Sequence, residues 1–528
     1  MRRMAVGLGG IVAAAFVVLP LTGSVPVVRV GPILLFFLLA LIGVARPWRW
    51  TSGDWNAADE WKPSAGVIRL GAVITGLTLC WFLLTRFRSG EINAIDFTVY
   101  YDRPNFQTAI GNLLFVESGD DPMRSWRTYL SVHAHWAMVP LALFYLVLPS
   151  PLWTLTLSVF AVVAGAVYSL RIIQRAGGGG ALAVASALAF VLNDNTARTL
   201  NYGFHVEVLY AWFLPWMIDA GLRRRWMPFL LAGLATVAVK EDAFLPLLAV
   251  AATVILVSGK GLTRVERFLI VPAPIVVALI NLELFLQVVV PRFSASGAVF
   301  YATYWANYGP TTGTAMLGML RHPWRVLMST LDSSFLRAVA LPHLYLPFVG
   351  WRWFVGALPI VILYGASANE QLRSFGIYYA IVLVPFLVLA AAAGARGLAE
   401  LVNGGARTRV VMSAVVVIAA MAGGISTGGY SLRPWKQEIA KLPQVLESLN
   451  AEKSVLVQSG LYPHAGYDAR VQLLTSQTLG DPRFAGAAIV LAPGLSAYPF
   501  DADGLAPLLL LPEILRTPEG LLVVRRLP

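Results

Sequence analysis

Runs of about twenty apolar residues recur along this chain, and they constrain its fold more than any other feature. A helix of about that length crosses the hydrocarbon of a bilayer with all its backbone groups hydrogen-bonded internally. The 528 residues are 57% hydrophobic and only 13% charged, which is more apolar than a water-soluble domain requires. The sequence therefore predicts a polytopic membrane protein built from α-helices.

About thirteen segments fit such a span. They are residues 4–22, 29–46, 67–88, 151–174, 181–193, 205–221, 226–240, 243–258, 267–290, 335–349, 352–366, 375–393 and 409–427. The basic loops between them all face the cytoplasm only if the N-terminus is cytoplasmic and the C-terminus is outside. Residues 133–148 are apolar but short, and a crossing there would turn every later basic loop outward. We therefore expect a helix that lies in or dips into the outer interface.

The same loops account for most of the net charge of +12. This charge is a topology signal rather than a surface for nucleic acid, so we expect no nucleic-acid partner. The single cysteine, Cys80, lies inside an apolar run. An intramolecular disulfide and a thiolate metal cluster are therefore excluded.

The chain divides into three regions by composition. Residues 1–66 read as an extra N-terminal transmembrane hairpin with a cytoplasmic loop, and residues 67–429 as the main transmembrane domain. That domain carries two long outer segments, residues 89–150 and 291–334. Residues 430–528 change character, because a helical pattern is followed by SVLVQS, AAIVLAP and LLVVRRLP, which are typical of buried strands. We expect a small α/β domain on the outer face.

Ionisable residues gather between Asn193 and Asp242, where the surrounding sequence makes them costly. His205 and Glu207 open one predicted span, and Lys240, Glu241 and Asp242 close the next. The turn Arg223–Arg225 between these spans is expected in the cytoplasm. The far ends of both spans then meet at the outer surface, so these side chains predict a functional site there.

Six segments, in order along the chain, resemble a known family. They are IDFTVYYDRPNFQTAIGN, SVHAHWAMVPLALFYLVLPSP, GFHVEV, VKEDAF, FGIYYAIVLVPFLVLAAAAGA and GLYPHAGYDARVQLL. Together they resemble a prokaryotic polytopic membrane family of unknown function that is grouped with the GT-C glycosyltransferases, over roughly residues 68–528. The most specific parts are FH-x-E and KED. The chain departs from the family where Phe97 and Thr98 follow Asp96, and where Val206 replaces a proline.

This resemblance implies a GT-C-like bundle with a long first outer loop and an outer C-terminal domain. Enzymes of that class transfer a sugar from a polyprenyl-phosphate donor to an acceptor at the outer leaflet. By this likeness Asp96 is the candidate base that activates the acceptor hydroxyl, with Glu207 as a second catalytic candidate and Asp102 as the fallback. The plain alternative for Asp96 is a solvated loop acid or a helix cap.

The remaining candidates are assigned to substrate binding. Lys240 suits a donor phosphate, with Glu241 and Asp242 to orient it, although an internal salt bridge at the end of the span explains the same residues. Arg198 is a second phosphate candidate or a surface charge. His205 joins this set; Asp96, His205 and Glu207 would suit zinc or manganese, or else form a hydrogen-bonded network that braces the loop.

Four further residues are assigned to structural roles, and the function itself stays open between alternatives. We assign His133 and His135 to structure rather than catalysis, and Tyr378 with Tyr379 to the outer aromatic belt. The favoured function is a glycosyltransferase of the cell envelope, in the inner or plasma membrane, with a lipid-linked sugar donor and membrane lipids as partners. The alternative is a transporter, or a lipid-handling or non-catalytic membrane protein of the same fold.

Overall fold

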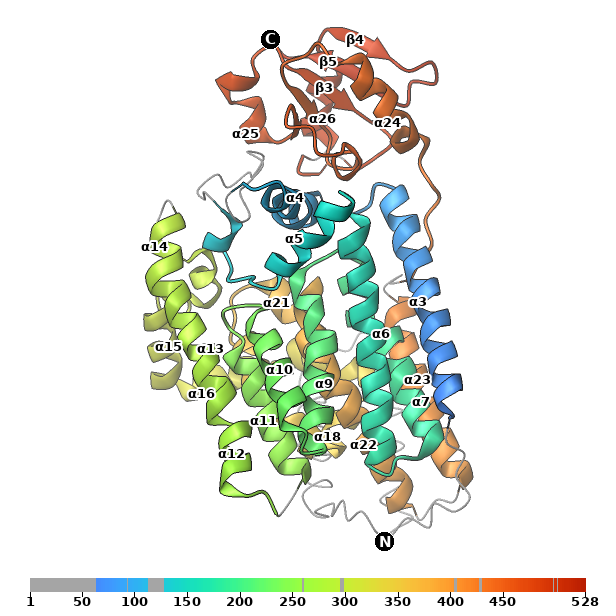
Figure 1. The fold of residues 1–528 in the computed structure, drawn as a ribbon, viewed down its shortest axis with the longest axis vertical. Coiled ribbons are helices and arrows are strands. Elements are labelled where there is room, and N and C mark those ends of the chain that lie inside the picture. The colour runs from blue at the N-terminus through green and yellow to red at the C-terminus, as the bar shows by residue number, and fades with distance from the viewer. Residues whose placement is uncertain are drawn as a thin grey trace.

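The computed structural model describes residues 63–92, 94–112, 128–258, 261–294, 299–402, 406–426, 430–496, 498–500 and 502–528. The predicted spans at residues 4–22 and 29–46 lie outside this part, as does nearly all of the predicted hairpin region 1–66. The described chain forms a helical bundle with a small domain containing a β-sheet at one end, and the C-terminus lies in that domain (Figure 1).

The bundle is built from long apolar helices and several shorter ones. The longer ones are α3 (Ala65–Arg88), α6 (Leu152–Arg175), α7 (Gly179–Leu192), α9 (Tyr210–Leu222), α10 (Trp226–Val237), α11 (Phe244–Ser258), α13 (Pro272–Leu284), α22 (Val384–Leu401) and α23 (Ala406–Ser426). Within the described residues, four segments are long and apolar enough to cross a membrane: Ala65–Arg88, Leu152–Arg175, Arg264–Phe293 and Val384–Leu401. The total of about thirteen spans stays a prediction.

Helix α22 forms the centre of the bundle, whereas α3 lies on its surface. In the most apolar window of each, 78% of the residues of α22 are buried but only 17% of those of α3. Glycines let the backbones of α22 and α18 (Leu346–Val349) approach closely, since a Cβ on Gly394 would lie 2.1 Å from the carbonyl oxygen of Leu346. Such contacts between small residues are how apolar helices pack in a bilayer.

The predicted span at residues 335–349 is wrong as a single helix. The structure breaks it into α17 (Ser333–Ala340), a 3₁₀ turn at Leu341–His343, and α18. Pro342 follows the end of α17, and Leu344 and Tyr345 both have left-handed backbones with φ of 48° and 58°. Hydropathy does not reveal this break, because the segment is predominantly apolar. The helix is ended by Pro342 and by the left-handed backbones of Leu344 and Tyr345.

Short elements of the first outer segment lie between the bundle and the sheet (Figure 1). They include the π-helical η3 (Ala94–Asp102), α4 (Arg103–Ala109) and α5 (Met138–Val147). Helix α5 has 10 residues, about 15 Å of length, which is too short to cross a bilayer. The amide of Ala137 just before it donates to the carbonyl of Ala238 at 2.8 Å, which ties this segment to the end of α10. Its place at the outer interface stays a prediction.

The C-terminal domain has a five-stranded sheet of order β2-β1-β3-β5-β4. Its strands are β1 (Val455–Val457), β2 (Val471–Leu473), β3 (Ala488–Leu491), β4 (Glu513–Arg516) and β5 (Val523–Arg526), with α24 (Gln437–Ser448) before them. The β2-β1-β3 part is parallel, and β5 pairs antiparallel with β3 and β4. The central strands β1 and β3 are buried throughout, as their continuous apolar runs predict. The small C-terminal sheet is thus confirmed.

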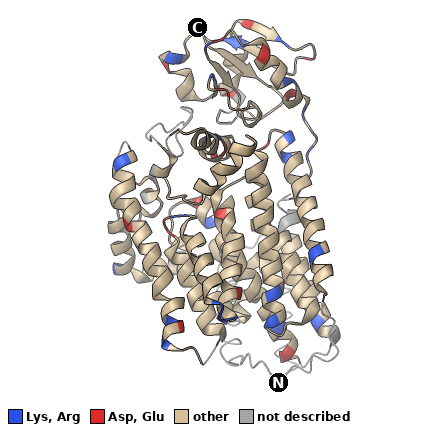
Figure 2. Ribbon diagram, viewed as in Figure 1, with Lys and Arg blue, Asp and Glu red and all other residues tan. Residues whose placement is uncertain are grey.

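Basic residues gather at the end of the bundle away from the sheet (Figure 2). Arg175 at the end of α6 pairs with Asp219 of α9, and Arg224 lies 3.6 Å from Glu266 of α12 (Arg264–Ile270). Arg396 of α22 donates to the carbonyl of Ala176 at 2.5 Å. The structure therefore places basic loops that are far apart in the sequence at one common end, opposite the sheet domain.

Candidate functional site

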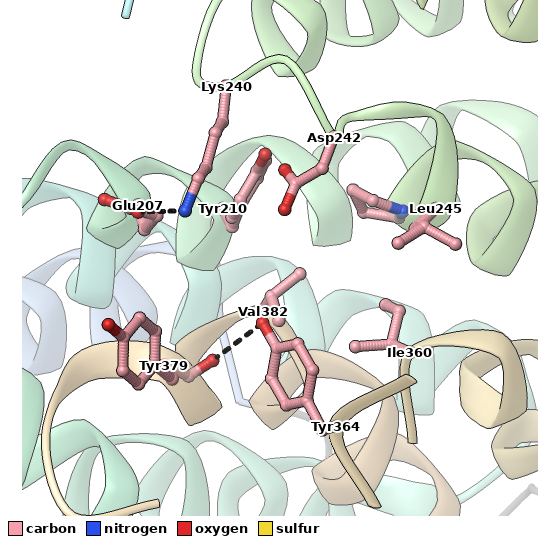
Figure 3. Close-up of a pocket in the computed structure, with 10 residues that line it drawn as sticks. Glu207, Tyr210, Lys240, Asp242, Leu245, Ile360, Tyr364, Tyr379 and Val382 are labelled. Atoms are coloured by element: carbon pink, nitrogen blue, oxygen red, sulfur yellow. Dashed lines mark hydrogen bonds and ion pairs between the residues drawn. The ribbon is translucent and has the colours of Figure 1, made fainter. Parts of the chain in front are cut away.

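A pocket lies between the turn that joins α10 to α11 and the start of α9 (Figure 3). Its empty volume is about 380 Å³, open solvent included. Its lining combines charged, phenolic and apolar side chains: Glu207, Tyr210, Lys240, Asp242, Leu245, Pro246, Ile360, Tyr364, Tyr379 and Val382. Three of the sequence-predicted residues, Glu207, Lys240 and Asp242, are among them.

Glu207 holds a buried charged cluster together. One of its oxygens accepts a hydrogen bond from Lys240 Nζ at 3.0 Å, and the other contacts Nδ1 of His205. The side chains of Glu207 and Lys240 are only 7% and 13% exposed. A buried charge is tolerated when a partner of opposite charge compensates its lost hydration. This ion pair therefore keeps two ionic side chains at the pocket.

The backbone explains how residues two apart in sequence meet. His205 is extended (φ −134°, ψ 135°), and a 3₁₀ turn, η5 (Val206–Leu209), follows before α9 begins. On a continuous helix the two side chains would point about 200° apart. The change from extended to helical backbone brings the imidazole back to the carboxylate. Tyr101 Oη lies 2.9 Å from His205 Nδ1, and the Tyr378 ring stacks on the imidazole with centroids 3.4 Å apart.

Asp96 is connected to this cluster through the side chain of Tyr202. Its carboxylate accepts a hydrogen bond from Tyr202 Oη at 2.6 Å, and the Tyr202 ring centroid is 6.4 Å from that of His205. Burial raises the pKa of Asp96 above its ordinary value, although nearby His205 and the Tyr202 hydroxyl oppose that shift. A carboxylate whose pKa is raised takes up a proton more readily, which suits a general base.

The KED triplet divides between two environments. Lys240 and Asp242 line the pocket, whereas Glu241 braces the first outer segment. Glu241 accepts from His133 Nδ1 at 2.9 Å and from the amide of Ala134 at 2.9 Å. Its side chain is 1% exposed. These contacts support a structural function for Glu241.

Asp102 and Arg198 have other partners. Asp102 is 2% exposed and accepts hydrogen bonds from Tyr145 at 2.8 Å and from Tyr467 of the C-terminal domain at 2.9 Å. Burial raises the pKa of Asp102 to about 6, although the two phenol hydrogen bonds and Arg103 oppose the shift. Arg198 pairs with Asp194 at 2.7 Å and donates to the carbonyl of Phe375 at 3.4 Å. Neither residue lines the pocket.

Tyrosines are the site residues that the sequence reasoning missed. Tyr210, Tyr364 and Tyr379 line the pocket, and Tyr364 donates to the carbonyl of Tyr379 at 3.4 Å (Figure 3). The hydroxyl of Tyr210 is buried and has no hydrogen-bond partner among the described residues. The assignment of Tyr378 and Tyr379 to an outer aromatic belt is corrected: both face the site. Among the tyrosines near the site, only Tyr202 and Tyr210 have a signal in the sequence, because they flank the GFHVEV motif.

The metal alternative finds no support in the described residues. Among them, no group of three or more His, Cys, Asp or Glu side chains is arranged to hold a metal ion. Asp96 instead contacts Tyr202, while His205 and Glu207 contact each other and Glu207 contacts Lys240. The hydrogen-bonded network, which was the alternative to a metal site, describes their arrangement.

Fold and site together define a multi-pass membrane protein with a helical bundle, a small C-terminal sheet and a polar pocket among apolar helices. Residues 99–470 match a family described as predicted membrane protein (DUF2079), and the chain belongs to that family. No relative was found among proteins with curated descriptions.

Solved structures that are similar to this chain include the following two. ArnT from Cupriavidus metallidurans in the apo state has 13% sequence identity and a TM-score of 0.48, over 88% of this chain and 98% of that one. The oligosaccharyltransferase of Archaeoglobus fulgidus, in complex with Zn and sulfate, has 10% identity and a TM-score of 0.34, over 84% of this chain and 62% of that one.

Proposed function

We propose that this protein is a membrane glycosyltransferase of the GT-C type, which transfers a sugar from a polyprenyl-phosphate donor to an acceptor hydroxyl at the outer leaflet. One observation carries the proposal: the GFHVEV and VKEDAF motifs, which carry the family resemblance, meet through the Glu207–Lys240 ion pair at one pocket. The pocket lies among apolar helices, where a polyprenyl lipid dissolves, yet its polar residues suit a phosphate and a sugar.

The proposed chemistry divides between two side chains. The acceptor oxygen attacks the anomeric carbon of the sugar, and the bond from that carbon to the phosphate oxygen breaks. The polyprenyl phosphate leaves with the bonding electrons, and the hydroxyl proton passes to Asp96. Lys240 Nζ has three donors and gives one to Glu207, so its others are available to the phosphate. Asp242 and the pocket tyrosines are proposed to bind sugar hydroxyls.

The proposed orientation places the C-terminal domain outside and the end of the bundle that carries Arg175 and Arg224 in the cytoplasm of the inner or plasma membrane. After Pro528, we therefore expect a reporter that is active only outside the cytoplasm to give a signal, and a reporter that is active only in the cytoplasm to give none. The matched fusion, inserted beside Arg225, is expected to show the reverse. Cytoplasmic activity of the C-terminal fusion would refute this orientation.

The donor class is tested by the lipids that the protein retains. We expect the protein purified in mild detergent to carry a polyprenyl-phosphate sugar, detected by mass spectrometry of extracted lipids. A Lys240→Ala variant should retain less of it, because a charged hydrogen bond to phosphate is lost. A control substitution of exposed Arg516 should change nothing. Equal retention by the Lys240 variant, or retention of ordinary phospholipids alone, would count against the proposed donor site.

A further inference from the structure

The segment that carries Asp96 is shared between two hydrophobic cores. In η3, Ala94, Ile95 and Val99 are buried in the core of the C-terminal domain. Phe97 and Tyr101 of the same segment are buried in the core of the helical bundle. The position of Asp96 therefore depends on how the C-terminal domain sits on the bundle.

Two polar residues at the end of η3 fasten it to the C-terminal domain. Arg103 donates to the carbonyls of Val471 at 2.8 Å and Gly466 at 3.1 Å, and its guanidinium lies 4.3 Å from the Tyr462 ring centroid. Asp102 accepts from Tyr467, a bond that joins positions 365 residues apart in the chain. The Tyr467 ring also stacks on Phe106 with centroids 4.3 Å apart.

Two consecutive residues at the end of η3 contact different parts of the protein. Asp102 contacts Tyr467 of the C-terminal domain, whereas Tyr101 contacts His205 of the pocket cluster, which consists of His205, Glu207 and Lys240. A continuous series of contacts thus runs from the sheet domain through η3 to His205, Glu207 and Lys240. Asp102 and Tyr101 are buried and Tyr467 is partly buried, so a shift of the sheet domain is transmitted to η3 instead of being absorbed by free space.

We propose that Arg103 and Tyr467 are positioning residues, through which the C-terminal domain holds η3 so that Asp96 and Tyr101 face the pocket cluster. Their catalytic importance rests on the proposed function, but their hold on η3 does not. Neither residue lines the pocket, and both act through the backbone segment between them and Asp96.

The hold is measured by amide hydrogen exchange of the full-length protein in detergent. Tyr467→Phe removes one hydroxyl and keeps the ring that stacks on Phe106. We expect amides of residues 94–102 to exchange about tenfold faster in this variant, since a hydrogen bond to a charged group is lost. Arg103→Lys should have a similar effect, because a lysine cannot reach two carbonyls in the fixed geometry of a guanidinium.

Two control variants match these changes. Tyr168→Phe removes a hydroxyl from α6 near Arg171, and Arg516→Gln removes an exposed arginine of the sheet domain. Neither should alter exchange at residues 94–102, and exchange within α6 should stay unchanged in the two test variants. If residues 94–102 exchange alike in test and control variants, the positioning role is refuted.

A transfer assay separates this inference from the proposed function. If the protein transfers sugar, Tyr467→Phe should lower kcat and leave the KM for the lipid donor unchanged, because the base moves while Lys240 stays. A lowered donor affinity with normal kcat would contradict positioning of Asp96. If the variants exchange faster but the unmodified protein transfers no sugar, the positioning of η3 stands and the proposed glycosyltransferase activity is refuted.

Discussion

Glu207→Gln is expected to lower the free energy of unfolding by about 3–5 kcal/mol. The amide keeps the shape of the side chain but not its charge. Lys240 would then be a buried cation without its partner, since its ammonium lies 3.0 Å from Glu207. His205, which contacts the other carboxylate oxygen, loses that negative charge at the same time and keeps Tyr101 as a partner.

The measurement is unfolding of the purified protein in detergent micelles, with Glu513→Gln as the control. Glu513 also pairs with arginines, Arg516 at 2.9 Å and Arg525 at 3.0 Å, but its own side chain is exposed. Water screens an exposed ion pair and both side chains lose conformational freedom to form it, so the control should change the stability little. The double variant Glu207→Gln with Lys240→Met should recover much of the loss, because no charge then stays buried alone. A Glu207→Gln loss no larger than the control would contradict the ion pair.

Much of this fold could be predicted because apolar length and strand pattern are local properties. Helices α3 and α6 begin and end within two residues of the predicted spans 67–88 and 151–174. The strands β1 and β3 occur in the predicted apolar runs for the same reason. The break between α17 and α18 was not predictable from hydropathy, since Leu344 and Tyr345 adopt left-handed backbones within an apolar sequence.

The candidate site could be predicted in part, because ionisable side chains among apolar spans are costly and stand out. This reasoning selected Glu207 and Lys240, which the structure joins. It could not separate Glu241 from Asp242, because neighbouring residues in a turn point in directions that only the tertiary fold decides. It also could not place Asp102, whose partner Tyr467 is 365 residues further along the chain.

The pocket tyrosines show a different limit. Tyrosine is common at membrane interfaces, so Tyr379 carries no signal in the sequence that distinguishes a belt from a site. What distinguishes it is the partner set: it lines the pocket opposite Glu207 and Lys240. Such a set depends on η10 (Tyr378–Val382) packing against η5, a contact between segments about 170 residues apart.

Asp96→Asn is expected to lower the rate of sugar transfer by roughly 10²–10⁴-fold while donor binding stays intact. Asparagine keeps the acceptor for the Tyr202 hydroxyl, which lies 2.6 Å away, but it cannot take the proton from the acceptor hydroxyl. Lys240→Ala is expected to act the other way, with weaker donor binding, because the leaving phosphate loses a cation. The two substitutions thus separate proton removal from donor recognition.

Both variants are compared by donor binding and by transfer on the same preparations, with Asp503→Asn as the matched change of an exposed acid in α26 (Ala502–Leu509). Because Lys240→Ala also leaves Glu207 buried without its cation, its donor affinity counts only where unfolding shows the protein folded. Full transfer by Asp96→Asn would move the base elsewhere, and Asp102→Asn would then be tested, although its contacts with Tyr145 and Tyr467 oppose that assignment. If both variants are folded, bind the donor and transfer sugar normally, the active site does not lie at this pocket.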